Sequence, residues 1–411
     1  MYRNIREKDF SFIHVGGLKK GGKWKLPNKI MATVYLHIGT MKTGTSALQR
    51  FLDTNREYLK EQGFLYPRLE LGLPEQFFFR NGHFVVYYAG RKNLLDQNVD
   101  QQEVIKMACR QLGELAKNIE NIVLSDELIW HYAAKKQDFW TELAESFRKI
   151  NCDLKVILYL RRQDTFIESL YSHAVKSNHK MAGEFSDYLK GNVVKKFVMD
   201  YDSGIKELER QLGREKLLIR IYDQEKYIKN RNLIFADFLE VLGLSLDGNY
   251  VMPEKVSNAG LAGNYIEFKR VMNGVPEYRE LENFMAGPLV LASSVKTGEK
   301  IRRREGFFSG EQRKEFMSLF EEGNRRLAKE YFGREDGVLF EEPEEELAKW
   351  HLDEENLWKD ILISMTEVIC AQEKKIVKLE TRWKELAEER ENRRINKIYR
   401  RVKNILNHES Q

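Results

Sequence analysis

A lysine, a glycine and three hydroxyl side chains lie together in the segment KTGTS, residues 42–46. The apolar run 34–38 before it predicts a buried strand, and apolar residues at helical spacing from Ala47 onward predict a helix. Backbone N–H groups at a helix start point toward a bound anion, and the helix dipole favours negative charge there. We therefore expect a phosphate or sulfate group to bind at Lys42, Thr43, Gly44, Thr45 and Ser46.

The position of the lysine distinguishes this loop from that of the nucleoside triphosphatases. In their motif, GxxxxGK[ST], the lysine directly follows the second glycine. Here Lys42 precedes Gly44 by two residues. A nucleotide-binding, kinase-like phosphotransferase is therefore a second hypothesis, disfavoured by this order.

A second candidate phosphate site follows another predicted strand. The run 154–160 is apolar, Arg161 comes directly after it, and Ser169 follows eight residues later in a predicted helix that begins at Thr165. An arginine offers a bidentate fork and a serine offers a hydroxyl donor, so the two can meet on one phosphate. Arg162 is the alternative for the arginine.

Both motifs resemble those of the sulfotransferases that use 3′-phosphoadenosine 5′-phosphosulfate (PAPS), in particular the bacterial carbohydrate sulfotransferases. The resemblance rests on KTGTS and on LYLRRQDTFIESLYSHAVK, and it extends over about residues 31–340. It implies a P-loop-like sulfotransferase fold, with PAPS as sulfuryl donor, PAP as product and no metal. It also implies that the loop holds the 5′-phosphosulfate, that Arg161 and Ser169 hold the 3′-phosphate, and that Ser257-Asn258 belongs to a loop closing over the nucleotide.

Sulfuryl transfer to a hydroxyl requires a general base and a group that stabilises the developing charge. Lys42 can stabilise that charge. Glu127 and His83 are the alternatives for the base, with Asp126 behind them; a histidine has the better unperturbed pKa for the task. His37, inside the first strand, is expected to be structural or to neighbour the cofactor.

The acceptor expected from the resemblance is a carbohydrate, such as a surface polysaccharide or a glycolipid precursor. Two aromatic groups, Phe77-Phe78-Phe79 and Tyr87-Tyr88, are candidates to line an acceptor cleft. Packing of these rings in the core is the competing interpretation.

Strands separated by helices, each strand almost entirely apolar, predict an α/β fold with a mostly parallel sheet flanked by helices. Ligands in such sheets bind at the carboxyl ends of the strands. The loop 39–46, the pair 126–127 and the segment 161–169 all follow strands, so we expect them at one edge of the sheet.

Composition sets the broad class of the protein. The net charge is +5 with 32% charged residues, which suits an anionic cofactor and does not indicate a nucleic-acid partner. Three cysteines show neither disulfide nor metal-ligand spacing, and no apolar run approaches about 20 residues. A cytoplasmic location is expected, with the inner membrane surface as a second possibility.

Three regions are predicted: a basic, poorly ordered leader at 1–30, a sulfotransferase domain at 31–340, and a charged helical extension at 341–411. Within the domain, 309–332 is expected to form one amphipathic helix. In the extension, apolar residues recur at three- and four-residue intervals over 376–386 and again over 395–405, in different phase. Such a helix suits a coiled coil that makes a homo-oligomer, or a peripheral membrane contact. A non-catalytic PAP-binding scaffold protein is the third hypothesis.

Overall fold

The structure of the chain is a computed structural model. It describes residues 31–73, 79–90, 100–191, 198–223, 226–227, 230, 232–253, 261, 263–280, 285–297, 305–342 and 348–408. The predicted leader at 1–30, Phe77-Phe78 and Ser257-Asn258 lie outside these residues.

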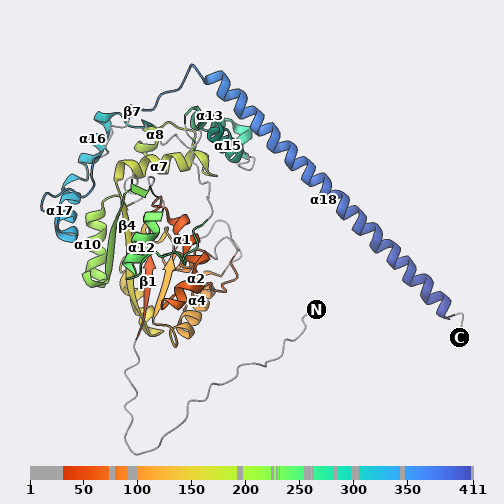
Figure 1. Ribbon diagram of the computed structural model, residues 1–411, viewed down its shortest axis with the longest axis horizontal. Coiled ribbons are helices and arrows are strands. Elements are labelled where there is room, and N and C mark those ends of the chain that lie inside the picture. Colours follow the sequence, from red (N-terminus) through yellow and green to blue (C-terminus); the bar gives the residue numbers. More distant parts are fainter. Residues whose placement is uncertain are drawn as a thin grey trace, which may run out of the picture.

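Five strands form one sheet in the order β2-β3-β1-β4-β5, and every neighbouring pair is parallel (Figure 1). The strands are β1 (Ala32–His37), β2 (Phe64–Leu65), β3 (Asn121–Ser125), β4 (Cys152–Arg161) and β5 (Leu217–Tyr222). The predicted α/β class with a parallel sheet is confirmed. Because β1 lies between β3 and β4, the segments that follow these three strands meet at one edge.

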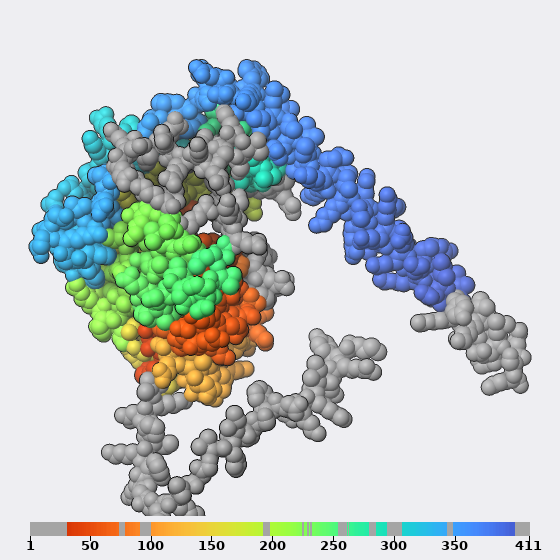
Figure 2. Space-filling model, viewed as in Figure 1, coloured from red at the N-terminus to blue at the C-terminus, as the bar shows by residue number. Residues whose placement is uncertain are grey.

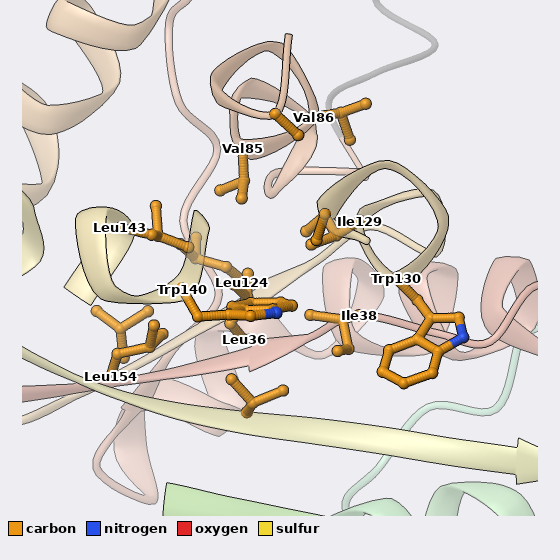
Figure 3. Close-up of a cluster of buried hydrophobic side chains, with 14 of the residues drawn as sticks. Leu36, Ile38, Val85, Val86, Leu124, Ile129, Trp130, Trp140, Leu143 and Leu154 are labelled. Atoms are coloured by element: carbon orange, nitrogen blue, oxygen red, sulfur yellow. The ribbon is translucent and has the colours of Figure 1, made fainter. Parts of the chain in front are cut away.

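One face of the sheet is covered by six helices that share its largest apolar core. They are α3 (His83–Tyr88), α4 (Gln101–Leu115), α5 (Ile129–Ala133), α6 (Phe139–Lys149), α10 (Tyr201–Leu212) and α17 (Glu321–Phe332). Figure 3 shows Leu36 and Leu124 of the strands among side chains from α3, α5 and α6. Alternate strand residues point to this face, as the two-residue period of a strand requires.

The opposite face is covered by α1 (Thr45–Thr54), α2 (Arg56–Glu61) and α12 (Asn232–Val241). Its core contains the strand residues Val123, Ile157 and Tyr159. The helix predicted from Ala47 to about Gln62 is divided at Asn55. The Asn55 side chain donates to the carbonyls of Phe51 and Val251, both at 2.8 Å, and thereby ties the break to a distant loop.

A third apolar core lies beyond the carboxyl edge of the sheet. It joins α7 (Gln163–Lys176), α8 (Phe185–Lys190), α13 (Asn264–Gly274), α15 (Ala286–Thr297) and α16 (Gly310–Ser318). Helix α7 follows β4 directly and lies across the end of the sheet (Figure 1). Short elements complete this part of the chain: η2 (Arg214–Lys216), α14 (Pro276–Glu280), β6 (Glu305–Gly306) and β7 (Ala348–Lys349).

The single helix expected over 309–332 is wrong, because the chain forms two helices there, α16 and α17. Phe316 and Phe320 pack in the third core, whereas Leu327 and Ala328 pack in the first. A continuous helix would present one face to one core. The break at 319–320 lets the two halves serve different cores.

The C-terminal helix α18 (Leu357–His408) extends away from the rest of the molecule (Figures 1 and 2). The predicted helical C-terminal region is confirmed, since α18 covers 357–408. The expectation that the whole extension is helical is wrong near its start. Residues 348–349 form β7 in parallel with β6, and the Trp350 N–H donates to the Gly306 carbonyl at 2.7 Å. Backbone pairing with 305–306 therefore replaces helix there.

Candidate functional site

The loop 38–44 joins the end of β1 to the start of α1 and is held against β4. The Thr40 N–H donates to the Tyr159 carbonyl at 2.9 Å, and the Tyr159 N–H donates to the Gly39 carbonyl at 2.7 Å. The Thr43 hydroxyl donates to the Thr40 carbonyl at 2.6 Å. Helix α1 begins at Thr45; the N–H groups of Ala47 and Leu48 donate to the Gly44 carbonyl at 3.0 and 3.1 Å, whereas those of Thr45 and Ser46 precede the first acceptor that the helix supplies. The predicted order of strand, loop and helix start is therefore present at 32–54.

Gly44 is required at the helix start for two reasons. Its φ is 74°, in the left-handed region that favours glycine, and a Cβ there would lie 2.8 Å from Cδ1 of Ile234. The residue is the N-cap of α1, and no side chain caps the helix. The left-handed φ and the contact with Ile234 therefore both require glycine at this N-cap.

Arg161 is directed at the loop, and Arg162 is directed elsewhere. The Arg161 Nη1 donates to the Lys42 carbonyl at 2.5 Å, and its Nε donates to the Thr165 hydroxyl at 3.1 Å. Arg162 instead pairs with Asp164 at 3.2 Å and with Glu342 at 2.8 Å. Of the two alternatives for the phosphate arginine, Arg161 is the one that contacts the loop.

Ser169 is partly buried on α7, on a face that carries two further basic groups. His173 and Lys176 follow it at four and seven residues, so all three lie on one side of the helix. The electrostatic interaction of His173 with Lys42 places this side toward the loop. His173 is exposed, yet desolvation by its neighbours and the charge of Lys42 lower its pKa to about 4, so its imidazole is neutral near pH 7.

Lys42 lies among positive charges. Burial is the largest effect on its pKa, and Arg161 and Lys176 lower it further, to about 8, while Glu127 acts in the opposite direction. A cluster of three cations that repel one another is stabilised by a bound anion. Lys42, Arg161 and Lys176 therefore form a cluster of positive charge beside the loop.

Glu127 lies on the other side of the loop, after β3. Its carboxylate accepts a hydrogen bond from Nε2 of Gln49 at 2.9 Å, and its side chain is 17% exposed. A Cβ at Gly39 would lie 2.9 Å from the Glu127 carbonyl, so the backbones of the two loops touch. Glu127 is thus a partly exposed carboxylate beside the Lys42 loop.

His83 and Asp126 form a buried network behind Glu127. His83 Nδ1 lies 2.8 Å from Oδ2 of Asp126, and the Arg80 guanidinium makes a bidentate contact to the same carboxylate. Burial raises the pKa of Asp126, but Arg80 and His83 outweigh it and hold the pKa well below its usual range. His83 is only 2% exposed. It therefore lies deeper than Glu127.

His37 is a buried histidine at the end of β1. Its Nδ1 lies 2.9 Å from the Ser125 hydroxyl, and its ring packs edge-on against Tyr159 and Phe238. Burial lowers its pKa to about 4. These contacts fit the structural alternative for this residue.

The aromatic residues expected near an acceptor cleft are divided between surface and core. Tyr87 is 3% exposed and its neighbour His83 packs edge-on against it. Phe79 has the Arg50 guanidinium over its ring at 5.8 Å. Packing therefore accounts for Tyr87.

A separate hollow of about 600 Å³ lies between α7, α8, α13 and α16, lined by Tyr171, Phe185, Phe307, Phe316 and Trp350. Tyr171 is on the side of α7 away from Ser169.

Four residues at this edge were not identified as site residues from the sequence: Gln49, Arg80, His173 and Lys176. The spacing of Ser169, His173 and Lys176 on one helix face was the available signal for the last two. Arg80 and Asp126 are 46 residues apart, and no local pattern joins them.

Within the described ranges, no group of three His, Cys, Asp or Glu side chains has the arrangement of a metal site. Among the described helices, none is long and apolar enough to cross a membrane.

Comparison with known sequences gives one partial relative and no family. No family model matches the chain. An uncharacterized protein of Archaeoglobus fulgidus is 30% identical over 200 residues, which is 46% of this chain and 49% of that protein. The chain thus spans about half the length of this curated relative.

Comparison with solved structures gives low-scoring similarities. A sulfotransferase from Alicyclobacillus acidocaldarius has a TM-score of 0.36 at 15% identity, covering 55% of this chain and 86% of its own. The sulfotransferase domain of the Synechococcus PCC 7002 olefin synthase scores 0.34 at 14% identity, over 66% and 98% of the two chains. Retinol dehydratase in complex with androsterone and inactive cofactor PAP scores 0.30 at 13% identity, over 76% and 83%. Because these scores are below 0.5, we base the functional proposal on the geometry of the chain itself.

Proposed function

We propose that this protein transfers a sulfuryl group from PAPS to a hydroxyl of a carbohydrate acceptor. The observation that carries the proposal is the convergence of the Lys42 loop, Arg161 and the Ser169 face of α7 at one edge of the sheet. Lys42 and the start of α1 suit one anionic group, and Arg161 with Ser169 suits a second. A nucleotide with phosphates on both its 5′ and 3′ positions has this pattern of charge.

Each side chain has a role that its surroundings support. Lys42 and the N–H groups of α1 bind the 5′ end of the donor and stabilise negative charge on the bridging oxygen. Arg161 fixes the 3′-phosphate while its Nη1 holds the loop carbonyl. PAPS would supply the activated sulfuryl group: the acceptor oxygen bonds to sulfur as the bond from sulfur to the bridging oxygen of the 5′-phosphate breaks, PAP leaves, and the hydroxyl proton passes to the general base.

Glu127 is the general base that we propose. A base must reach the hydroxyl proton of the acceptor. Glu127 is partly exposed beside the loop, whereas His83 is enclosed and bound to Asp126. His83 then acts as a positioning residue, because it and Arg80 hold Asp126, the neighbour of Glu127, in place. The carbohydrate assignment rests on the sequence resemblance of 31–340.

Transfer of labelled sulfate from PAPS to glycan acceptors tests this function. We expect transfer by the full chain and its loss in Lys42→Ala. Binding of 3′,5′-ADP without transfer to any hydroxyl acceptor would favour the scaffold hypothesis instead. Tighter binding of ATP than of 3′,5′-ADP would favour a phosphotransferase.

A further inference from the structure

Helix α18 begins as part of the globular molecule. The buried Asp360 accepts a hydrogen bond from Nδ2 of Asn264 at 2.9 Å, and the buried Ser364 donates to the Asp360 carbonyl at 2.7 Å. These side chains face α13 and α15. One face of the first turns is thus fixed against the protein, which sets the direction in which the rest of the helix leaves it.

Beyond these first turns the helix is surrounded by solvent. Every side chain from Glu373 to Ile398 is exposed. Figure 2 shows this part as a rod projecting from the molecule. Helical stability in proteins comes mostly from packing of an apolar face, so an apolar stripe on a free helix indicates a missing partner.

The stripe has the spacing of a coiled-coil seam. Starting at Trp358, core positions recur at alternating intervals of four and three residues as far as Leu386. With Leu362 as an a position, the a residues are Leu362, Ile369, Ile376 and Trp383, and the d residues are Trp358, Met365, Gln372, Leu379 and Leu386. The eight apolar ones are 48–76% exposed. An a/d repeat over four heptads, interrupted only by Gln372 at one d position, is the pattern of helices that pair with one another.

The residue types at these positions indicate a coiled coil of two helices. Isoleucine at a with leucine at d favours a parallel dimer over a trimer or tetramer. Here Ile369 and Ile376 are at a, and Leu379 and Leu386 are at d. A seam of this width is also narrower than the broad apolar face of a helix that lies in a membrane surface.

The flanking charges set the orientation. Lys375 is at a g position and Glu380 at the following e position, so in a parallel pair each lysine faces the glutamate of the other chain. In an antiparallel pair, e positions face e positions and g positions face g positions. Glu373 would then meet Glu380 across one side of the interface, and Lys375 would meet Arg382 across the other. Like charges therefore oppose the antiparallel arrangement.

We propose that two copies of this chain associate through a parallel, two-stranded coiled coil formed by residues 358–386. Both globular units then lie at the same end of the coil. Arg390 and Arg393 occupy the next a and d positions and end the seam. This inference is independent of the proposed sulfuryl transfer.

Equilibrium sedimentation of the full chain tests the association. We expect a dimer with twice the chain mass of 48.6 kDa. The double variant Ile376→Asp/Leu379→Asp should weaken dimerisation by more than about 100-fold, because it places unpaired carboxylates in the seam. Val377→Asp/Thr381→Asp is the matched control. Both of its positions are exposed on the same two turns and lie off the seam, so it should remain dimeric.

Cysteine cross-linking tests the orientation. In a Cys370→Ser background, Leu379→Cys should form a disulfide-linked dimer on mild oxidation, since equal d positions meet in a parallel pair. Thr381→Cys, on the outer face, should not.

Three results would overturn the proposal. A monomeric wild-type chain at about 50 μM, well above micromolar dissociation constants, would exclude this dimer. If the control variant dissociates as readily as the seam variant, the a and d residues do not form the dimer interface. Binding of the monomeric chain to anionic phosphatidylserine vesicles, lost in the seam variant, would show that the stripe is a membrane contact.

Discussion

Arg161 donates from Nη1 to the backbone carbonyl of Lys42 at 2.5 Å, across 119 residues of sequence. The Arg161 guanidinium also lies over the Tyr222 ring at 5.6 Å, from the neighbouring strand β5. One side chain therefore joins the carboxyl ends of β1, β4 and β5. The proposed function assigns recognition of the second phosphate to the same arginine that holds the loop carbonyl.

Replacing Arg161 with lysine should weaken 3′,5′-ADP binding by about 10- to 100-fold, because the charge stays but the bidentate fork is lost. Arg162→Lys is the control. It should change the affinity by less than about threefold, since Arg162 is engaged by Asp164 and Glu342. Isothermal titration calorimetry measures both. The assignment of Arg161 fails if the Arg162 variant loses affinity and the Arg161 variant keeps it.

Affinity for 3′,5′-ADP should decrease as pH rises through about 8. Burial and the neighbouring cations lower the pKa of free Lys42 to about 8, and a bound anion raises it again. The protonated amine binds the phosphate, so the full affinity is present below about pH 8 and is lost above it. Titrations between about pH 7 and about pH 9.5 keep the phosphates dianionic.

Lys42→Arg is the control for this pH dependence. Its guanidinium stays charged throughout the range, so its binding should be nearly independent of pH. An equal decrease in both proteins would assign the titration to another group.

Glu127→Gln should lower kcat by about 100- to 10,000-fold and leave the affinity for 3′,5′-ADP unchanged. The amide oxygen can still accept from Gln49, so the local hydrogen bond is retained. His83→Gln should mainly lower Tm, with kcat within about tenfold, because His83 is enclosed. Steady-state kinetics and thermal unfolding separate the two effects. A stable His83 variant without turnover would make His83 the base.

Asp126→Asn should lower the free energy of unfolding by about 3–5 kcal/mol, since it breaks a buried, bidentate ion pair and leaves Arg80 with the longer contact to Glu127 at 3.9 Å. Asp53→Asn removes a bidentate pair in which the Arg68 side chain is 48% exposed, and should cost less than about 1 kcal/mol. Urea denaturation compares them. Equal losses would show that burial of the Asp126 network contributes nothing.

The same carboxylate predicts the response to acid. The folded-state pKa of Asp126 is lowered, so its contribution is complete above its unfolded pKa and is lost as pH falls toward the folded value. The difference in unfolding free energy between wild type and Asp126→Asn should therefore shrink below about pH 4. A constant difference down to acid pH would contradict the lowered pKa.

The sheet and its carboxyl edge could be predicted because each strand is a nearly continuous apolar run. The strand predicted before the pair 126–127 is β3, and the loop after β1 was recognised from its lysine and glycine. The relation between Arg161 and Lys42 follows from the adjacency of β1 and β4, which a parallel sheet allows but a single sequence does not specify.

The remaining features depend on contacts distant in sequence. The break at Asn55 is set by the carbonyl of Val251, and the division between α16 and α17 is set by two separate cores. The choice between Glu127 and His83 depends on burial, which the motifs around each residue do not encode. Periodicity located the C-terminal helix, but only the docking of Asp360 and Ser364 shows which face is left for a partner.

The central claim is that the protein binds one nucleotide through two separate phosphates. Calorimetric titration with 3′,5′-ADP and with 5′-AMP, which lacks the 3′-phosphate, tests it most directly. We expect 3′,5′-ADP to bind about 100-fold more tightly than 5′-AMP, and Arg161→Lys to remove most of this difference. Equal affinity for the two nucleotides, or no binding of 3′,5′-ADP, would contradict it.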